Sequence, residues 1–314
     1  MRNIINKGLL LLSTSFAIIA CDPVEKDKYE LGSVESITEK GISFDYTASE
    51  NSENILVFTN TSKYNQPVSA RWDFGNGATA QSSSAEAVYP QSGDYEVSLT
   101  LYAANGTSAT KKQTITIAND DFSLLDKPVY NMLTGGIDNA EGKVWQLDRY
   151  NLYTAEVAAA TGFGISGHMG LGAQGSYSQQ WWAAEPDAKK DWSLYPTTFN
   201  FVHNGLKLNI ETEGLGYGRN ASSASVGGFT PIESFGDDVS FAYESGSYSF
   251  SISEAGKYPV LTLSDKAFMG LYCGTQQYEI IYQTDSVLAL RVNNTTESQD
   301  WVFVYTLESL NTLP

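Results

Sequence analysis

Short segments in which apolar and polar residues alternate fill the first third of the chain. Residues 42–46 and 95–101 alternate strictly, residues 114–117 repeat the pattern, and residues 55–60 form a more continuous apolar run. Turn-forming residues separate the segments at 60–62, 75–77 and 105–106. Alternation with period two, interrupted by a turn about every 8–12 residues, is typical of a β-sandwich. We therefore predict a first sandwich domain over residues 32–119.

A larger unit follows the polar junction at residues 119–121 and extends over residues 120–314. Eight further segments have the strand pattern: 143–148, 198–201, 206–210, 248–252, 260–263, 278–282, 287–292 and 301–305. The one helix-like segment is 154–160, which Gly162 ends. Eight strands without internal repeats predict a jelly-roll-like β-sandwich, so the expected fold class is all-β.

The chain begins with a short apolar segment behind positive charges. Arg2 and Lys7 precede a mostly apolar run over residues 9–20, and Ile18-Ile19-Ala20-Cys21 ends it. A membrane span needs about 20 apolar residues, so this arrangement favours a secretory signal peptide. The last four residues resemble a bacterial lipobox. This implies a lipoprotein signal peptide over residues 1–20 and lipidation of Cys21, whereas an ordinary cleaved signal is the alternative.

Residues 21–31 are charged and lack a periodic apolar face, which predicts a flexible tether. The segment resembles the acidic stretch after the lipidated cysteine in surface-exported lipoproteins of Bacteroidetes-type bacteria. The resemblance implies an outer-membrane protein that faces the cell exterior and touches the membrane through its lipid alone. An anchor facing the periplasm is the alternative.

Composition narrows the classes of partner. The formal net charge is -17, which argues against nucleic acid, whose binding depends on Lys and Arg at phosphates, and against lying flat on anionic lipid. Two histidines are too few for a His-rich metal centre, and we expect neither a metal nor another cofactor. If Cys21 carries lipid, Cys273 has no disulfide partner and its apolar surroundings predict a buried thiol.

A tryptophan motif in the first domain resembles the PKD-type immunoglobulin-like domain. The matching residues are Trp72-Asp73-Phe74-Gly75-Asn76-Gly77, then Tyr89, Gly93, Asp94, Tyr95, Val97 and Leu99. Val88-Tyr89 stands where the family has His-x-Tyr. We expect Trp72 in the core, and the resemblance implies that the domain is a spacer between the membrane and a binding domain.

The candidate chemistry is concentrated in the long segment 162–196, which we expect to be an irregular loop. It holds three of the six tryptophans together with polar side chains. Neutral sugars need aromatic rings to stack on and a few polar groups to bind their hydroxyls. The candidate ligand-binding residues are Trp181, Trp182, Trp192, Tyr195, His168, Glu185, Asp187 and Lys190.

Alternative roles for these and other aromatic residues depend on their place in the fold. Because neighbours on a strand face opposite sides, one of Trp181 and Trp182 is expected to be buried. Trp145 and Trp301 lie on alternating strands and are expected in the core. The segment 214–220 is a second, weaker candidate loop.

The second domain also resembles the C-terminal domain of PKD-containing surface glycan-binding lipoproteins from Bacteroidetes polysaccharide-utilisation loci. The matching motifs include Lys143-Val144-Trp145-x-Leu147-Asp148, Gly167-His168-x-Gly170-x-Gly172, the Trp181-Trp182 pair and the closing Trp301. Where the family carries Tyr-Asp-Asp, this chain has Tyr195-Pro196-Thr197. The resemblance implies non-catalytic capture of a polysaccharide, such as the β-glucan laminarin, beside an outer-membrane transporter and its partner glycan-binding lipoprotein.

The sequence gives less support to two other classes of function. A retaining glycoside hydrolase needs two carboxylates about 5–5.5 Å apart, and the nearest pattern, Glu211-Thr212-Glu213, lacks the third acid of laminarinase-like enzymes. No Gly-x-Ser-x-Gly elbow occurs either, so we expect a protein that is not an enzyme. An adhesin or protein-binding module fits the first domain equally well, but the crowded tryptophans of the second favour sugar.

Overall fold

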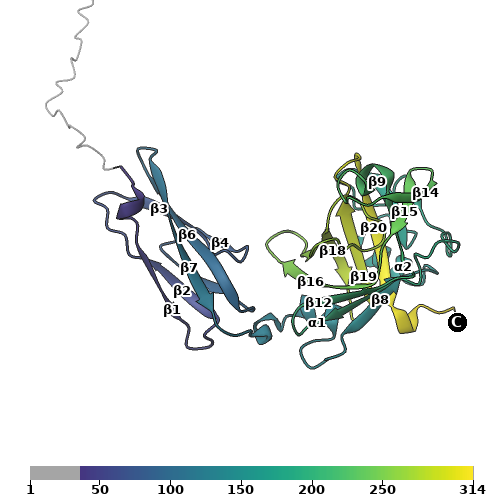
Figure 1. The fold of residues 1–314 in the computed structure, drawn as a ribbon, viewed down its shortest axis with the longest axis horizontal. Coiled ribbons are helices and arrows are strands. Elements are labelled where there is room, and N and C mark those ends of the chain that lie inside the picture. Colours follow the sequence, from purple (N-terminus) through teal and green to yellow (C-terminus); the bar gives the residue numbers. More distant parts are fainter. Residues whose placement is uncertain (1–35, 314) are drawn as a thin grey trace, which may run out of the picture.

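The computed structural model describes residues 36–313 and places them in two β-rich bodies joined by a short segment (Figure 1). The predicted signal peptide, Cys21 and the tether lie outside the described residues. Within residues 36–313, no helix is both long and apolar enough to span a membrane.

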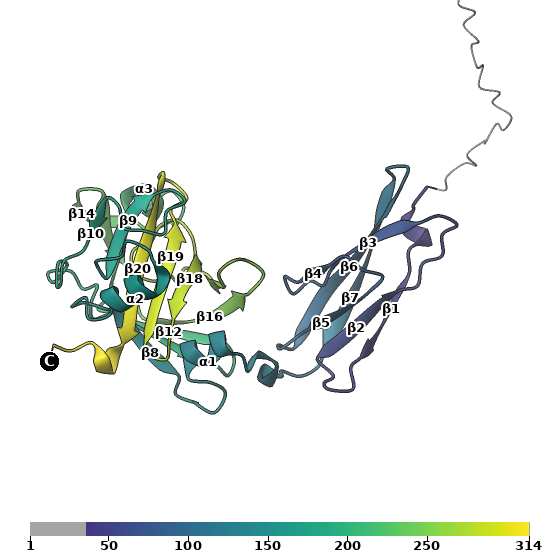
Figure 2. The ribbon, with the colours of Figure 1, turned by 180° about the vertical axis from the view of Figure 1, so that it is seen from behind.

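Two antiparallel sheets form the first body, shown in purple and blue in Figures 1 and 2. It opens with the short helix η1 (Glu39–Gly41). One sheet contains β1 (Phe44–Ala48), β2 (Ile55–Asn60) and β5 (Ser84–Val88). The other contains β4 (Thr79–Ala80), β3 (Val68–Asp73), β6 (Gly93–Ala103) and β7 (Ser108–Ile117). The alternating segments of the sequence thus form the predicted sandwich.

Aromatic side chains from both sheets fill the core of the first body. Trp72 is fully buried and stacks on Phe74, with ring centroids 6.0 Å apart and planes 10° apart. The Trp72 indole N–H donates to the carbonyl of Ser82 at 2.9 Å. Gly75 lies two residues after the end of β3 and has φ +73°. It is so close to the Glu96 carbonyl that a Cβ at this position would lie 2.7 Å from the carbonyl oxygen. The prediction that Trp72 is a core residue is confirmed.

Both bodies hold the junction segment. On the first body, Asn54 donates from Nδ2 to the Asn119 carbonyl and Ser52 donates to the Asp121 carboxylate, at 2.8 and 2.9 Å. The next residue, Phe122, begins η2 (Phe122–Leu125) and is buried in the core of the second body. Its carbonyl accepts from His203 Nε2 at 3.2 Å. The connection therefore has contacts at each end.

Eight antiparallel strands in the second body form one closed sheet. They are β8 (Lys143–Leu147), β11 (Thr198–Val202), β12 (Lys207–Glu211), β16 (Gly246–Ser253), β17 (Val260–Leu263), β18 (Gln277–Gln283), β19 (Val287–Asn293) and β20 (Gln299–Leu307). Each pairs with the next in sequence, and β20 pairs with β8 to close the ring. The eight predicted strands and the all-β class are confirmed, and the closed sheet replaces the two separate sheets of a jelly roll.

Two insertions and several short helices decorate this ring. Between β8 and β11 lie α2 (Thr154–Thr161), β9 (Met169–Ala173) and β10 (Trp182–Ala183), the last two extending the sheet from β20. Between β12 and β16 lie β13 (Leu215–Arg219), α3 (Asn220–Ser223), β14 (Pro231–Phe235) and β15 (Asp238–Ala242). The remaining helices are α1 (Pro128–Thr134) and η3 (Glu308–Leu310). The predicted helix is α2, and its C-cap Gly162 has φ +72°.

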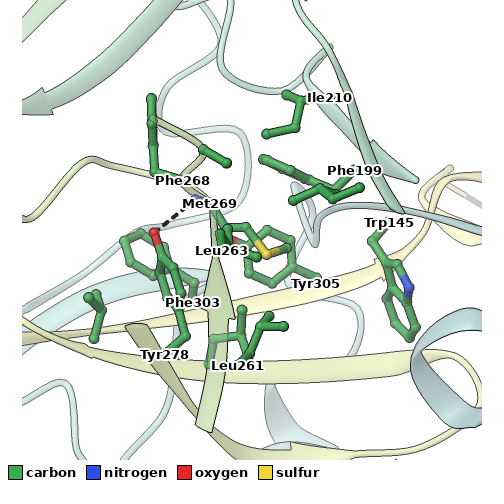
Figure 3. Close-up of a cluster of buried hydrophobic side chains, with 14 of the residues drawn as sticks. Trp145, Phe199, Ile210, Leu261, Leu263, Phe268, Met269, Tyr278, Phe303 and Tyr305 are labelled. Carbon is green, nitrogen blue, oxygen red and sulfur yellow. Dashed lines mark hydrogen bonds between the residues drawn. The ribbon is translucent and has the colours of Figure 1, made fainter. Parts of the chain in front are cut away.

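Side chains fill the interior of the ring (Figure 3). Trp145 and Trp301 are 0% and 2% exposed, which confirms both as core residues. The β17–β18 connection adds Met269, whose backbone N–H donates to the Tyr278 hydroxyl at 2.9 Å. Cys273 is a buried free thiol, as expected. Because side chains fill the interior, a ligand can bind only on the outside of the ring or on its insertions.

Candidate functional site

The segment predicted to be an irregular loop folds tightly across β9. A Cβ on Gly170 would lie 2.5 Å from the Trp182 carbonyl oxygen, and one on Gly172 would lie 2.3 Å from that of Ser178. These contacts leave no room for any side chain at either glycine. The glycine pattern therefore permits close backbone packing. The predicted irregular loop contains the short strand pair β9 and β10 and is otherwise made of turns and irregular structure.

The side chain of Gln179 fixes the segment between β9 and β10 to residues 166 and 167. Gln179 accepts the backbone N–H groups of Ser166 and Gly167 at its side-chain oxygen, both at 2.9 Å, and donates to the Gly167 carbonyl at 2.7 Å. Its own backbone N–H donates to the Gly164 carbonyl at 2.8 Å. Trp181 and Trp182, which follow Gln180, therefore stand on a backbone that these hydrogen bonds hold in place.

Trp181 and Trp182 are both exposed, 57% and 38% respectively. The Trp181 N–H donates to the Leu171 carbonyl at 3.0 Å, and Leu171 is also the register partner of Trp182. Two successive residues facing one partner is the arrangement of a β-bulge, which disrupts strict alternation. The prediction that one of the two rings is buried is therefore wrong.

Trp192 lies inside an aromatic cluster beside this strand. Its ring is stacked on Tyr217, with centroids 4.8 Å apart and planes 9° apart, and Phe235 contacts it at 4.8 Å. The Lys189 ammonium lies 3.8 Å from its centroid. No ammonium fits between two rings so closely stacked, so Lys189 covers the opposite face. Trp192 offers no free face to a sugar, and its predicted stacking role is withdrawn.

Lys189 connects this covered ring with the exposed one. Its ammonium also lies 5.5 Å from the centroid of Trp182 and 3.7 Å from a carboxylate oxygen of Asp238. Burial lowers the pKa of Lys189, and the neighbouring Asp238 partly opposes that shift. The Trp182 ring also meets the buried Trp301 edge to face at 6.3 Å. The Trp182 ring is thus held by Trp301 and Lys189, and the 38% of the residue that is exposed is accessible to a ligand.

Arg219 and Tyr217, from the segment interpreted as a second loop, belong to this site. That segment is strand β13, not a loop. Arg219 donates to both carboxylate oxygens of Glu297 at 2.8 Å and to Asp238 at 2.7 Å. Its guanidinium lies 5.6 Å from the Trp301 ring. The hydrogen bond from Arg219 is the main reason why the pKa of Glu297 is lowered. The glycine-rich pattern hid the strand, because alternating glycines weaken the apolar signal.

His168 and Tyr195 are buried and cannot contact a surface ligand, so both are withdrawn as ligand contacts. His168 Nδ1 donates to the side-chain oxygen of Asn151 at 2.8 Å, and its Nε2 accepts from the Tyr195 hydroxyl at 3.0 Å. The same hydroxyl accepts the backbone N–H of Lys189 at 3.0 Å. Burial lowers the pKa of His168 to about 4. The hydrogen bonds from Asn151 through His168 and Tyr195 therefore fix the backbone of Lys189.

The other three predicted residues follow β10 at the surface. Glu185 and Lys190 are exposed, whereas Asp187 is half-buried, has φ +64° and forms an ion pair with Arg149. Asp187 also receives the Lys190 N–H at its backbone carbonyl, at 3.0 Å. Glu185 and Lys190 have the access that a hydroxyl-binding role needs, and Asp187 is committed to shaping the turn. In residues 36–313, no group of three or more His, Cys, Asp or Glu side chains could hold a metal ion.

Comparisons with known proteins bear mainly on the first body. Residues 38–118 match the sequence model of the PKD domain. The PKD1 domain of the Vibrio cholerae metalloprotease PrtV is similar at 30% identity and a TM-score of 0.23, over 25% of this chain and 95% of that one. The PKD1 domain of Vibrio anguillarum Epp is similar at 25% identity and a TM-score of 0.23, over 25% of this chain and 92% of that one.

A structure that describes the promiscuous specificity of carbohydrate-binding modules from the β-sandwich superfamily is also similar. It is 10% identical with a TM-score of 0.22, over 86% of this chain and 92% of that one, and we draw no conclusion about ligands from it. A search of curated proteins finds no similar protein. The N-terminal body of this chain is a PKD domain, as its tryptophan motif predicts.

Proposed function

We propose that the second domain binds a neutral polysaccharide without cleaving it, at the surface formed by Trp181, Trp182 and Lys189. The observation that carries the proposal is the exposure of two adjacent indole rings, 57% and 38%, on a backbone fixed by Gln179. Large exposed apolar side chains gathered at one place mark interaction sites. Flat rings at fixed positions suit the C–H faces of sugar rings, because little conformational entropy is lost on contact.

The polar groups beside the rings suit hydroxyls. Lys189 and the exposed Lys190 are donors, and the exposed Glu185 is an acceptor. Three acidic and two basic side chains are mixed along residues 185–191, so the site has no strong field of one sign, which favours an uncharged ligand over a polyanion. Each ring contact is worth about 1 kcal/mol. Individual sites of this kind are weak, and neighbouring receptors on the same polysaccharide would add avidity.

The cellular context is part of the same proposal. Lipidation at Cys21 would anchor the chain in the outer membrane, and the PKD domain would hold the glycan-binding domain away from the bilayer. The captured polysaccharide, for which we propose a β-glucan such as laminarin, would then pass to an outer-membrane transporter and its partner glycan-binding lipoprotein.

Affinity electrophoresis of residues 21–314 in gels containing laminarin, other β-glucans, xylan or mannan tests the binding proposal. We expect retardation by at least one neutral glycan, and loss of most of that retardation in Trp181→Ala. Tyr102→Ala is the matched control, because Tyr102 is a 43% exposed ring on the PKD domain. Migration unaffected by every glycan, or equal retardation of wild type and Trp181→Ala, would contradict the proposal. Release of reducing sugar would place the protein among the hydrolases instead.

A further inference from the structure

A second group of aromatic rings lies on the outer face of the closed sheet. Phe163 follows α2, Tyr177 lies in the β9–β10 connection, and Tyr258 precedes β17; we call these three residues the outer aromatic patch. All three are partly buried and pack on an apolar cluster that includes Val302 and Val304. On β20 these two valines alternate with Trp301, Phe303 and Tyr305 of the interior, which places the patch on the outside.

The three rings contact one another. Phe163 and Tyr177 are stacked with centroids 5.0 Å apart and planes 26° apart, and Tyr258 lies 5.3 Å from Tyr177 at 45°. The exposed Lys257 places its ammonium 4.9 Å from the Tyr258 centroid and 5.6 Å from that of Tyr177. Three separate segments of the chain thus bring these rings together, with one ammonium close to two of them.

Ion pairs beneath the patch fix the orientation of Tyr177. The Arg291 guanidinium lies 4.4 Å from its centroid, donates from Nε to the Ser176 carbonyl at 2.8 Å, and pairs with Glu279 and Asp300. The Tyr177 hydroxyl donates to Glu279 at 3.3 Å. Buried ion pairs add little net stability but hold neighbouring groups in one geometry. Phe163 covers one face of Tyr177 and, since no guanidinium fits between two stacked rings, Arg291 covers the other. Tyr177 is therefore a fixed support, and Phe163 and Tyr258 are the rings of the patch on which a ligand can stack.

We propose that the glycan-binding surface continues from Trp181 onto the outer aromatic patch, so that one polysaccharide chain contacts both. Trp181 and Tyr177 are four residues apart on the same ordered loop, so their Cα atoms are separated by at most about 14 Å. Ser178 and Gln179 bond the intervening backbone to Gly164, the residue after Phe163, through contacts of 2.9 and 2.8 Å. The segment between Tyr177 and Trp181 is therefore fixed to the residue that follows Phe163. This inference rests on the proposed glycan binding.

The test is calorimetric titration of residues 21–314 with short and with long laminari-oligosaccharides, or with oligosaccharides of whichever glycan retards the protein in gels. Tyr258→Leu keeps apolar cover over the valines but removes the flat ring. We expect it to weaken binding of the long ligand about three- to tenfold, the effect of one lost ring contact, and to leave the short ligand unchanged. Lys257→Ala should act in the same direction without touching the core.

Two results would overturn the inference: affinities of both variants equal to wild type for every ligand length, or an equal loss for short and long ligands. A wild type that binds glycan and depends on Trp181, yet ignores Tyr258→Leu, would remove the extended surface and leave the proposed function standing. A wild type that binds no glycan would remove both. Tyr102→Ala again serves as the control for loss of an exposed ring.

Discussion

The ammonium of Lys189 lies 3.8 Å from the ring centroid of Trp192, between that covered ring and the exposed Trp182. The lysine is itself held from two sides: Tyr195 bonds its backbone and Asp238 faces its side chain. A cation over an aromatic face in a partly desolvated place contributes about 1–2 kcal/mol. Lys189 therefore links the packing of the loop to the surface that Trp182 presents.

Replacing Lys189 by Met keeps the length of the stem but removes the cation. We expect the free energy of unfolding to fall by about 1 kcal/mol, because the contact with Trp192 is lost. Glycan affinity should fall as well, since Trp182 loses a neighbour and the ligand loses a donor. Urea unfolding and calorimetric titration measure the two effects. For stability alone, Lys190→Met at the exposed neighbouring position is the control, and a Lys190 variant that costs as much stability would contradict this role of Lys189.

Much of the fold follows from sequence patterns. Period-two alternation predicts the eight strands of the closed sheet, and Gly162 predicts the end of α2. Closure of the ring could not be predicted, because it depends on the pairing of β20 with β8, whose residues are far apart in the chain. The exposure of both Trp181 and Trp182 could not be predicted either. It depends on the bulge at Trp181, where two successive residues do not point to opposite sides of the strand.

The candidate site was predicted in part for a similar reason. Tryptophan clustering indicates the loop that carries two exposed rings, Trp181 and Trp182. His168 and Tyr195 have the side chains of a binding site but lie beneath the loop, and no sequence pattern separates these two uses. Arg219 was missed because a lone arginine in a glycine-rich segment gives no hint of the acids, distant in sequence, that surround it.

The buried His168 predicts a pH dependence of stability. The unfolded chain binds a proton at this residue below about pH 6.5, whereas the folded protein does so only near pH 4. Between these values the unfolded state holds more protons, so the free energy of unfolding falls as the pH is lowered, by about 3 kcal/mol in all. His168→Gln should lose this part of the slope. Chemical unfolding of both proteins at several pH values between 4 and 7 measures it, and identical slopes would contradict the assignment.

Close packing across β9 predicts that Gly172 tolerates no side chain. In Gly172→Ala the new Cβ would lie 2.3 Å from the Ser178 carbonyl, so the loop must move away. We expect a loss of about 2 kcal/mol, faster proteolysis in the loop, and weaker glycan binding because Trp181 is no longer fixed. Gly164→Ala is the control, since its Cβ would meet Ser178 at an ordinary 3.5 Å. Equal stability of the two variants would show that the loop does not pack as described.

Lipidation at Cys21 is testable in cells that process lipoproteins. Cys21→Ala should abolish incorporation of labelled palmitate and leave the chain uncleaved at residue 20, because the modified sulfur is absent. Protease added to intact cells should degrade the wild type if the protein faces outward. Palmitate incorporation that persists in Cys21→Ala would exclude this residue as the anchor. Resistance to external protease, with degradation after lysis, would support an anchor facing the periplasm.

The charges around Arg219 give the largest expected change in stability. Arg219 and Asp238 have side chains 9% and 11% exposed, and Glu297 is 26% exposed. Removing the guanidinium in Arg219→Met leaves two largely buried carboxylates without their main partner, which costs about 3–5 kcal/mol. The double variant Arg219→Met with Glu297→Gln should recover part of this loss, because one uncompensated charge is gone.

An exposed ion pair provides the comparison. Lys112 and Glu96 are about 60% exposed on the PKD domain, and Lys112→Met should leave the denaturation midpoint unchanged. Because Arg219 lies under Trp301, which in turn supports Trp182, the double variant also separates stability from binding. If stability is partly restored while glycan affinity remains low, Arg219 positions the exposed indole. If affinity returns with stability, Arg219 only maintains the fold, and the site depends on Trp181 and Trp182 alone.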